Sequence, residues 1–288
     1  MSNARIIDNA AVPAPRPAPQ TLSALLSLGR PLVMGILNVT PDSFSDGGRF
    51  LDPTKAIAHG NEMAKRGADI IDIGAESTRP YGGAVPISAD EEKSRLAPVL
   101  PALTKLGIPL SIDTTKASVA AWAVDQGASI VNDVWGLQHD PAMAPLVAQR
   151  GVPVIIMHNR DTAEEHIDIV ADVMTFFARS LEIAARAGIP RDNIVLDPGI
   201  GFGKTAEQSI ICIARVGEFR RFGLPLLVGA SRKRFISSVV PSDPDDRLGG
   251  SISAHLLAAE KGASIIRAHD VAETVQALRI AAAIEGAL

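Results

Sequence analysis

Cysteine is almost absent from this sequence, since Cys212 is the single cysteine among 288 residues. A lone cysteine excludes a disulfide framework within the chain and a metal site built from several thiolates, and it is typical of a reducing compartment. We expect Cys212 to be a buried, small apolar residue. An excess of positive charge is also absent, because 28 Lys and Arg stand against 32 Asp and Glu. We therefore expect neither a nucleic acid nor an anionic membrane surface as a partner.

Long hydrophobic runs are missing as well. No uninterrupted apolar stretch approaches the roughly 18 residues that a membrane-spanning helix needs, and the start of the chain has no apolar segment typical of a secretory signal. Together with the lone cysteine, this predicts a cytoplasmic protein. Proline recurs in residues 11–19, where it removes amide donors and disfavours regular structure. We expect residues 1–20 to form a disordered arm and residues 21–288 to form one domain.

Short apolar runs rich in Val and Ile alternate with longer segments of helical composition, such as residues 54–66, 117–126 and 167–187. The eight runs are residues 32–37, 68–73, 110–113, 129–133, 152–157, 193–197, 224–228 and 263–267. Each run suits a strand that is covered on both faces in a parallel sheet. Eight strand and helix repeats predict an α/β fold, a (β/α)8 TIM barrel, with an open doubly wound sheet as the alternative.

A glycine stands where each helical segment should end and the next strand should begin. These glycines are Gly67, Gly107, Gly127, Gly151, Gly188, Gly223 and Gly262. Glycine suits this position because the residue that ends a helix often adopts a left-handed conformation. The recurrence supports the repeating architecture.

Polar residues follow nearly every predicted strand. They are Asn38, Asp72, Asp113, Asn132, Asp133, His158, Asp197, Ser231, Arg232, Lys233, Arg267 and His269. In a (β/α)8 barrel the carboxyl ends of all strands meet at one mouth, where the chemistry takes place. We therefore expect a concave, polar site at that mouth.

The charges of these side chains indicate that the ligand has two parts. Cations follow the last two strands, where such barrels commonly bind phosphate, so an anionic group is expected beside Arg232, Lys233, Arg267 and His269. Asp113, Asn132 and Asp197 follow the third, fourth and sixth strands and offer acceptors and an amide. That set suits a planar heterocycle with ring N–H and amino groups.

Glycine alternates in residues 197–205, at Gly199, Gly201 and Gly203, before Lys204. The spacing matches neither a phosphate-binding P-loop nor a dinucleotide-binding loop. We interpret these glycines as allowing close approach of the backbone to a ligand. Two other segments, residues 38–52 and 74–86, are long and irregular, and we expect them to be lids over the mouth.

Residues 35–48 and 67–80 resemble the two signature segments of the dihydropteroate synthase family. The resemblance extends from Pro31 to the carboxyl terminus. It continues through residues 111–114, 131–133, 197–204, 231–235 and 267–270. Members of that family join 6-hydroxymethyl-7,8-dihydropterin diphosphate to 4-aminobenzoate and release diphosphate, so the resemblance implies a transferase of folate biosynthesis.

The resemblance also implies roles for individual residues. Asp113, Asn132, Asp197 and Lys233 would bind the pterin, and Thr78, Arg267 and His269 would bind the diphosphate part of that substrate. Phe44, Pro80 and Ser231 would shape the 4-aminobenzoate pocket, which sulfonamides would also occupy. Asn38 would hold a Mg²⁺ ion at the diphosphate, in keeping with the oxygen ligands and waters that this ion prefers.

Four residues would act in catalysis: Asp113, Lys233 and Arg267, with Asp46 arriving on the first lid. The family further implies a homodimer, formed through late helices between residues 245 and 261 and after residue 270. Two alternatives remain at this point. A pterin-binding methyltransferase acting on methyltetrahydrofolate would share the ring-binding aspartates, and a pterin-binding paralogue without turnover would share the whole pocket.

Overall fold

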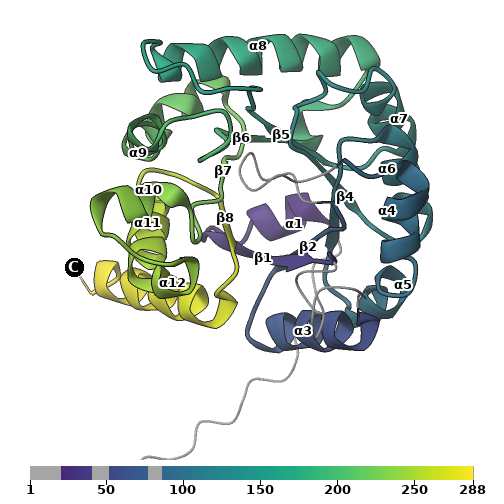
Figure 1. The fold of residues 1–288 in the computed structure, drawn as a ribbon, viewed down its shortest axis with the longest axis horizontal. Coiled ribbons are helices and arrows are strands. Elements are labelled where there is room, and N and C mark those ends of the chain that lie inside the picture. Colours follow the sequence, from purple (N-terminus) through teal and green to yellow (C-terminus); the bar gives the residue numbers. More distant parts are fainter. Residues whose placement is uncertain (1–20, 41–51, 77–85, 288) are drawn as a thin grey trace, which may run out of the picture.

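The computed structural model describes residues 21–40, 52–76 and 86–287. The predicted arm, residues 1–20, and the central parts of both predicted lids, residues 41–51 and 77–85, lie outside the described residues. The described part of the chain forms a ring of strands surrounded by helices, which Figure 1 shows in a view down the ring.

Eight strands form one parallel sheet in the order β6-β5-β4-β3-β2-β1-β8-β7. They are β1 (Leu32–Asn38), β2 (Ile70–Gly74), β3 (Leu110–Asp113), β4 (Ile130–Asp133), β5 (Val154–Met157), β6 (Ile194–Asp197), β7 (Leu227–Val228) and β8 (Ile265–Ala268). An isolated parallel bridge between Leu196 and Leu226 brings the two ends of this order together. The predicted (β/α)8 barrel is confirmed, and the open sheet is excluded.

Helices cover the outside of the ring, except α1 (Leu22–Leu26), which precedes the first strand and lies inside the ring (Figure 1). The others are α3 (Pro53–Lys65), α4 (Ala89–Leu96), α5 (Leu100–Leu103), α6 (Ala117–Asp125), α7 (Met143–Arg150), α8 (Ile169–Ala187), α9 (Ala206–Ala214), α10 (Arg234–Val239), α11 (Leu248–Glu260) and α12 (Val271–Glu285). The seven glycines predicted to end helical segments all have positive φ, from 65° at Gly151 to 105° at Gly127. Left-handed glycines therefore end these segments, as the sequence predicts.

The amino-terminal end of the barrel is closed by α1, which Figure 1 shows across the middle of the ring. Leu22 and Leu25 of α1 are each 2% exposed and belong to one apolar cluster with the strands. The strand residues of this base cluster are Leu32, Met34, Ile70, Ile130, Ile155, Val195, Leu227 and Ile265. Burying these side chains favours folding through the hydrophobic effect.

The seventh strand is shorter than the sequence predicts. Residues 224–228 are expected to form a strand, but β7 contains Leu227 and Val228 alone. Pro225 has no N–H for a ladder hydrogen bond, which interrupts regular pairing at this point. Cys212 lies buried in α9, as expected. In the described part of the chain, no helix combines the length and the apolar character needed to cross a membrane.

Candidate functional site

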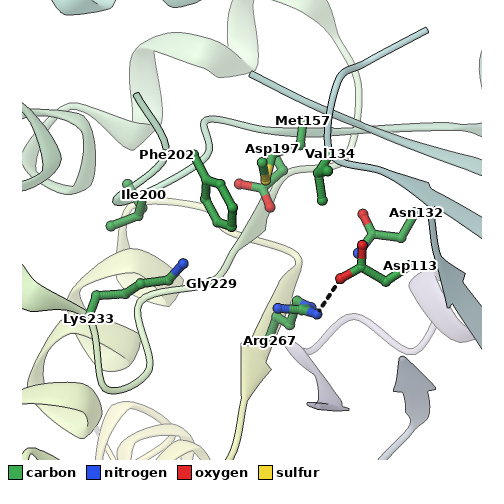
Figure 2. A pocket seen from close by; sticks show the side chains of 10 residues that line it. All are labelled: Asp113, Asn132, Val134, Met157, Asp197, Ile200, Phe202, Gly229, Lys233 and Arg267. Atoms are coloured by element: carbon green, nitrogen blue, oxygen red, sulfur yellow. Dashed lines mark hydrogen bonds and ion pairs between the residues drawn. The ribbon is translucent and has the colours of Figure 1, made fainter. Parts of the chain in front are cut away.

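A pocket lies among residues at the carboxyl ends of the strands, drawn in Figure 2. Its lining residues are Asp113, Asn132, Val134, Met157, Asp197, Ile200, Phe202, Gly229, Lys233 and Arg267. Five of these residues are the ones that the sequence predicts to bind one ligand, namely Asp113, Asn132, Asp197, Lys233 and Arg267, and the structure brings them together. Val134, Met157, Ile200 and Phe202 are apolar lining residues that the sequence analysis missed.

Alternating side-chain direction along the strands explains how polar groups reach the cavity. Successive residues of a strand point to opposite faces, so residues two apart point the same way. Each even-numbered strand places a polar residue two positions after a residue of the apolar base cluster. The pairs are Ile70 and Asp72, Ile130 and Asn132, Val195 and Asp197, and Ile265 and Arg267. The same strand face therefore builds the core at one end and the site at the other.

Arg267 joins two carboxylates across the barrel. Its Nε donates to Asp72 Oδ2 at 2.7 Å, and its Nη2 donates to Asp113 Oδ2 at 2.9 Å (Figure 2 shows the second bond). Asn132 Nδ2 also donates to Asp72 Oδ2, at 3.0 Å. Although burial lowers the pKa of Arg267, Asp72 and Asp113 together raise it above its usual value. Arg267 therefore stays charged and fixes the carboxylates.

Asp72 has no assigned role in the sequence analysis, yet it binds both Arg267 and Asn132. A signal was present, because Asp72 is an acidic residue inside an apolar run that is buried on both faces. A carboxylate in such a place needs a cation or several donors nearby.

Three acceptor oxygens in this group have no hydrogen-bond partner among the described residues. They are Asp72 Oδ1, Asp113 Oδ1 and Asn132 Oδ1, and all three are buried. Burial and the charge of Asp72 raise the pKa of Asp113 to about 7, against the opposing effect of Arg267. Because unpaired buried acceptors are costly, this face of the site is suited to a ligand that carries N–H donors.

Asp197 lies at the end of β6 and begins a glycine-rich turn. Its Oδ1 accepts a hydrogen bond from the Gly199 N–H at 2.7 Å. Burial raises the pKa of Asp197 to about 6, while the Gly199 N–H and nearby cations such as Arg267 and Lys233 oppose this shift. Asp197 thus adds a second carboxyl group, on a different strand from Asp113.

An apolar wall faces these polar groups. The Lys233 ammonium lies 4.0 Å from the centroid of the Phe202 ring, in cation–π geometry. Figure 2 shows Phe202 and Lys233 on the other side of the cavity from Asp113 and Asn132. A flat ring can lie against an aromatic wall while its edge reaches the acceptors. The geometry therefore suits a planar, polar-edged ligand.

Ser231 and His269 lie together at the ends of β7 and β8. The His269 N–H donates to Ser231 Oγ at 3.2 Å, and His269 Nδ1 lies 3.0 Å from the same oxygen. Arg232, which the sequence analysis placed among the cations of the mouth, instead binds acidic side chains. Its Nη2 donates to Asp270 Oδ1 at 2.6 Å and its Nη1 donates to Asp245 Oδ1 at 2.7 Å. Its φ of 57° turns the chain between Ser231 and Lys233.

Two of the three alternating glycines, Gly199 and Gly203, are needed for packing within the protein and not, as predicted, for close approach to a ligand. A Cβ atom on Gly199 would lie 2.0 Å from the carbonyl oxygen of His158, and one on Gly203 would lie 2.4 Å from Arg160 Cβ. These two glycines therefore allow the turn after β6 to pack on the segment after β5, not on a ligand. Gly201 does face the site, since its Cβ would lie 3.2 Å from Lys233 Cδ.

Asn38, the predicted metal ligand, is the last residue of β1 and is partly buried. The described residues include no group of three or more His, Cys, Asp or Glu side chains that could hold a metal ion. Four predicted site residues, Phe44, Asp46, Thr78 and Pro80, lie outside the described residues.

Comparison with known proteins agrees with the geometry of this site. Residues 34–269 match the family of pterin binding enzymes. The dihydropteroate synthase of Bacillus subtilis is 49% identical over 250 residues, which cover 86% of this chain and 87% of that protein.

Solved structures are similar over a comparable range. A Xanthomonas albilineans dihydropteroate synthase with 4-aminobenzoic acid has a TM-score of 0.85 and 44% identity, covering 90% of this chain and 94% of that one. A structure of the synthase from the same organism in complex with 7,8-dihydropteroate has a TM-score of 0.82 and 43% identity, covering 90% and 95%. With its acceptor-lined cavity at the mouth of a (β/α)8 barrel, this chain belongs to the dihydropteroate synthase family of pterin-binding enzymes.

Proposed function

We propose that this chain condenses 6-hydroxymethyl-7,8-dihydropterin diphosphate with 4-aminobenzoate and forms 7,8-dihydropteroate and diphosphate. The observation that carries the proposal is a set of two buried acceptors that line the pocket, Asp113 Oδ1 and Asn132 Oδ1, which have no hydrogen-bond partner among the described residues and lie opposite an aromatic wall. A pterin presents ring N–H and amino donors along one edge of a flat bicyclic ring, which complements that set.

We assign pterin binding to Asp113, Asn132 and Asp197 on the acceptor side and to Lys233 beside Phe202. Arg267 and His269 at the end of β8, with Thr78, are assigned to the diphosphate region of the substrate. Phe44, Pro80 and Ser231 are assigned to 4-aminobenzoate, and Asp46 to catalysis from its lid. The bonds from Arg267 to Asp72 and Asp113 support an additional function, which is to fix the carboxylates before the substrate arrives.

A Mg²⁺ ion fits the donor chemistry available at Asn38. This ion prefers oxygen ligands, keeps several waters and is often shared between one or two protein groups and substrate phosphates. One amide oxygen from Asn38 is compatible with such a site and does not require a cluster of carboxylates. When bound, Mg²⁺ would neutralise charge on the diphosphate oxygens.

In the proposed reaction, the C–O bond between the pterin methylene carbon and the diphosphate breaks, and its electron pair leaves with diphosphate. The amine lone pair of 4-aminobenzoate forms the new C–N bond, and the amine proton passes to solvent. Arg267 and Lys233 stabilise the departing negative charge, while the acceptor carboxylates tolerate a transient positive charge on the pterin. No strong base is needed, because an aryl amine is already neutral at about pH 7.

The direct test mixes the full chain with the pterin diphosphate, 4-aminobenzoate and Mg²⁺ and measures released diphosphate and formed dihydropteroate. Release that requires both organic substrates supports the proposal. Tight pterin binding without turnover would identify a non-catalytic paralogue, and methyl transfer from methyltetrahydrofolate would identify the methyltransferase alternative.

We also propose a cytoplasmic homodimer. Exposed apolar side chains lie on the late helices, with Leu257 of α11 50% exposed and Ile280 and Ile284 of α12 58% and 64% exposed. Apolar side chains at such exposure favour contact with a partner surface. The buried, free Cys212 is compatible with a reducing compartment. Sedimentation at micromolar concentration tests the dimer, and Ile280→Glu should then shift it toward monomer.

A further inference from the structure

We propose that Lys204 is a positioning residue for the pterin pocket, because it ties the turn after β6 to the segment after β5. This inference rests on the proposed function, since it concerns binding of the pterin substrate. Lys204 does not line the cavity, and nothing in the reaction above uses it.

The Lys204 ammonium is enclosed and fully engaged. Lys204 is 1% exposed, which is unusual for a lysine. Its Nζ donates to the carbonyl oxygens of Gly199 at 3.0 Å and Phe202 at 3.1 Å, and to His158 Nδ1 at 2.6 Å. An ammonium group has three donors, so each of these acceptors receives one.

The bond to His158 fixes the state of the imidazole. Because an ammonium can only donate, Nδ1 must accept, and the ring proton lies on Nε2. That Nε2 donates to Asp172 Oδ2 at 2.9 Å, and Arg160 Nη1 donates to Asp172 Oδ1 at 2.7 Å. Burial lowers the pKa of His158 to about 4 and the pKa of Lys204 to about 8, so a neutral imidazole and an ammonium coexist at neutral pH.

Both ends of this network adjoin walls of the pocket. On the β6 side, Gly199 and Phe202 bracket the turn that carries Ile200 and the aromatic wall. On the β5 side, His158 directly follows Met157, which also lines the cavity. Met157 and Phe202 belong to one apolar cluster with Val134, so Lys204 holds together the two segments that build this wall of the pocket.

The turn itself needs such a tie. Gly199, Gly201 and Gly203 all have positive φ, and three glycines give this segment a wide choice of backbone conformations. Two carbonyl oxygens of the turn accept from this one buried cation, and if it is removed the Phe202 oxygen loses this charged donor while the Gly199 oxygen keeps the Phe202 N–H. Without Lys204 we expect the turn to relax, and Phe202 to leave the position where it meets the Lys233 ammonium.

The test compares Lys204→Met, which keeps the length of the side chain and removes its donors, with the wild-type protein. Binding of 6-hydroxymethyl-7,8-dihydropterin is measured by calorimetry, and KM is measured separately for the pterin diphosphate and 4-aminobenzoate. We expect the pterin dissociation constant and the pterin KM to rise about tenfold or more, because buried acceptors lose a charged donor, while the 4-aminobenzoate KM changes less than about twofold.

Two further variants separate positioning from stability. Leu103→Ala, in fully buried Leu103 of α5 on the outer layer, should lower the melting temperature without changing either KM. Asp172→Asn weakens the contact that orients the His158 imidazole, and the Asp172 side chain is 30% exposed, so the variant should fold. It should raise the pterin KM by roughly threefold, and it carries the test if Lys204→Met does not fold.

Two results would overturn the inference. If Lys204→Met, or Asp172→Asn in its place, binds the pterin as the wild type does, Lys204 has a purely structural role and the inference alone is wrong. If the wild-type protein binds no pterin, the proposed function is wrong and the inference falls with it. The wild-type arm therefore distinguishes the two failures.

Discussion

The two ends of the barrel are built by the same strands but obey opposite rules. At the base, Leu22 and Leu25 of α1 pack on apolar strand residues. At the mouth, Asp72 and Arg267 form a buried, charged network in which acceptor oxygens have no partner within residues 21–40, 52–76 and 86–287. Two residues along a strand, as from Ile70 to Asp72, are enough to change from one rule to the other.

This difference separates stability from function along each strand. Burial of apolar area at the base favours folding, whereas burial of charge at the mouth opposes it unless the charges are paired. Forming the ligand site at the mouth therefore lowers the free energy of unfolding, and apolar burial at the base compensates for this loss. Changes at the two ends should consequently have different effects on activity and on unfolding.

Asp113→Asn should give the largest change in activity. The substitution removes one of the two carboxylates that Arg267 binds and presents an amide N–H₂ where the pterin needs an acceptor. Loss of a charge-assisted contact of this kind costs about 2–3 kcal/mol, so we expect kcat/KM for the pterin diphosphate to fall by about 100-fold. Steady-state kinetics measures this fall. As a matched control, Asp125→Asn on α6, where the side chain is 51% exposed, should leave kcat/KM unchanged.

Leu25→Ala should give the opposite result. Removing this buried side chain from the base should lower the free energy of unfolding by about 2–4 kcal/mol, through lost apolar burial and an unfilled cavity. We expect kcat/KM to stay near that of the wild type at temperatures where the variant is folded. Denaturant unfolding and kinetics on the same sample measure both. Leu28→Ala, just after α1 and 43% exposed, is the control and should change stability by less than about 0.5 kcal/mol. A large loss of activity in Leu25→Ala would contradict the separation.

Pterin affinity should depend on pH through the mouth. Burial raises the pKa of Asp113 to about 7, so this group is partly protonated in the free protein near neutral pH. Pterin N–H donors favour the ionised carboxylate, and binding should therefore release a proton. We expect affinity to fall by up to about tenfold for each pH unit below 7 and to level off above it. Calorimetry in buffers of different ionisation enthalpy measures the proton release, most of which should be lost at pH 7 in Asp113→Asn, because the pKa of the remaining carboxyl, Asp197, is about 6.

Phe44→Ala should give the smallest and most selective change. Phe44 is assigned to the 4-aminobenzoate pocket by resemblance, so its removal should raise the 4-aminobenzoate KM by roughly three- to tenfold through lost apolar contact. The pterin KM should remain within about twofold of the wild type. Equal changes in both KM values would show that the two substrate regions are not separable in this way.

Much of the fold was predictable because each repeat carries its own local signals. Helices expected at residues 117–126 and 167–187 are found as Ala117–Asp125 and Ile169–Ala187, with left-handed Gly127 and Gly188 after them. The strand after Gly223 was overestimated, because tertiary closure of the barrel and Pro225, not local apolar content, decide how much of it pairs.

The candidate site was predictable where a strand end points a polar residue at the mouth, as with Asp113 and Asp197. It was not predictable where the partner is distant in sequence. The direction of Arg232 depends on Asp270, and the burial of Lys204 depends on His158, which lies 46 positions earlier. Such contacts arise from the packing of whole segments, which composition and spacing do not encode.

The short β7 leaves the barrel with a seam, because the isolated bridge at Leu196 and Leu226 joins β6 to its neighbour. Local opening of the barrel should start at this seam, because few backbone hydrogen bonds hold its two sides together. The seam runs between the strand that ends in Asp197 and the one that leads to Lys233. A ligand that contacts both Asp197 and Lys233 would link the two sides of this seam. Ligand binding should therefore make the whole barrel more rigid.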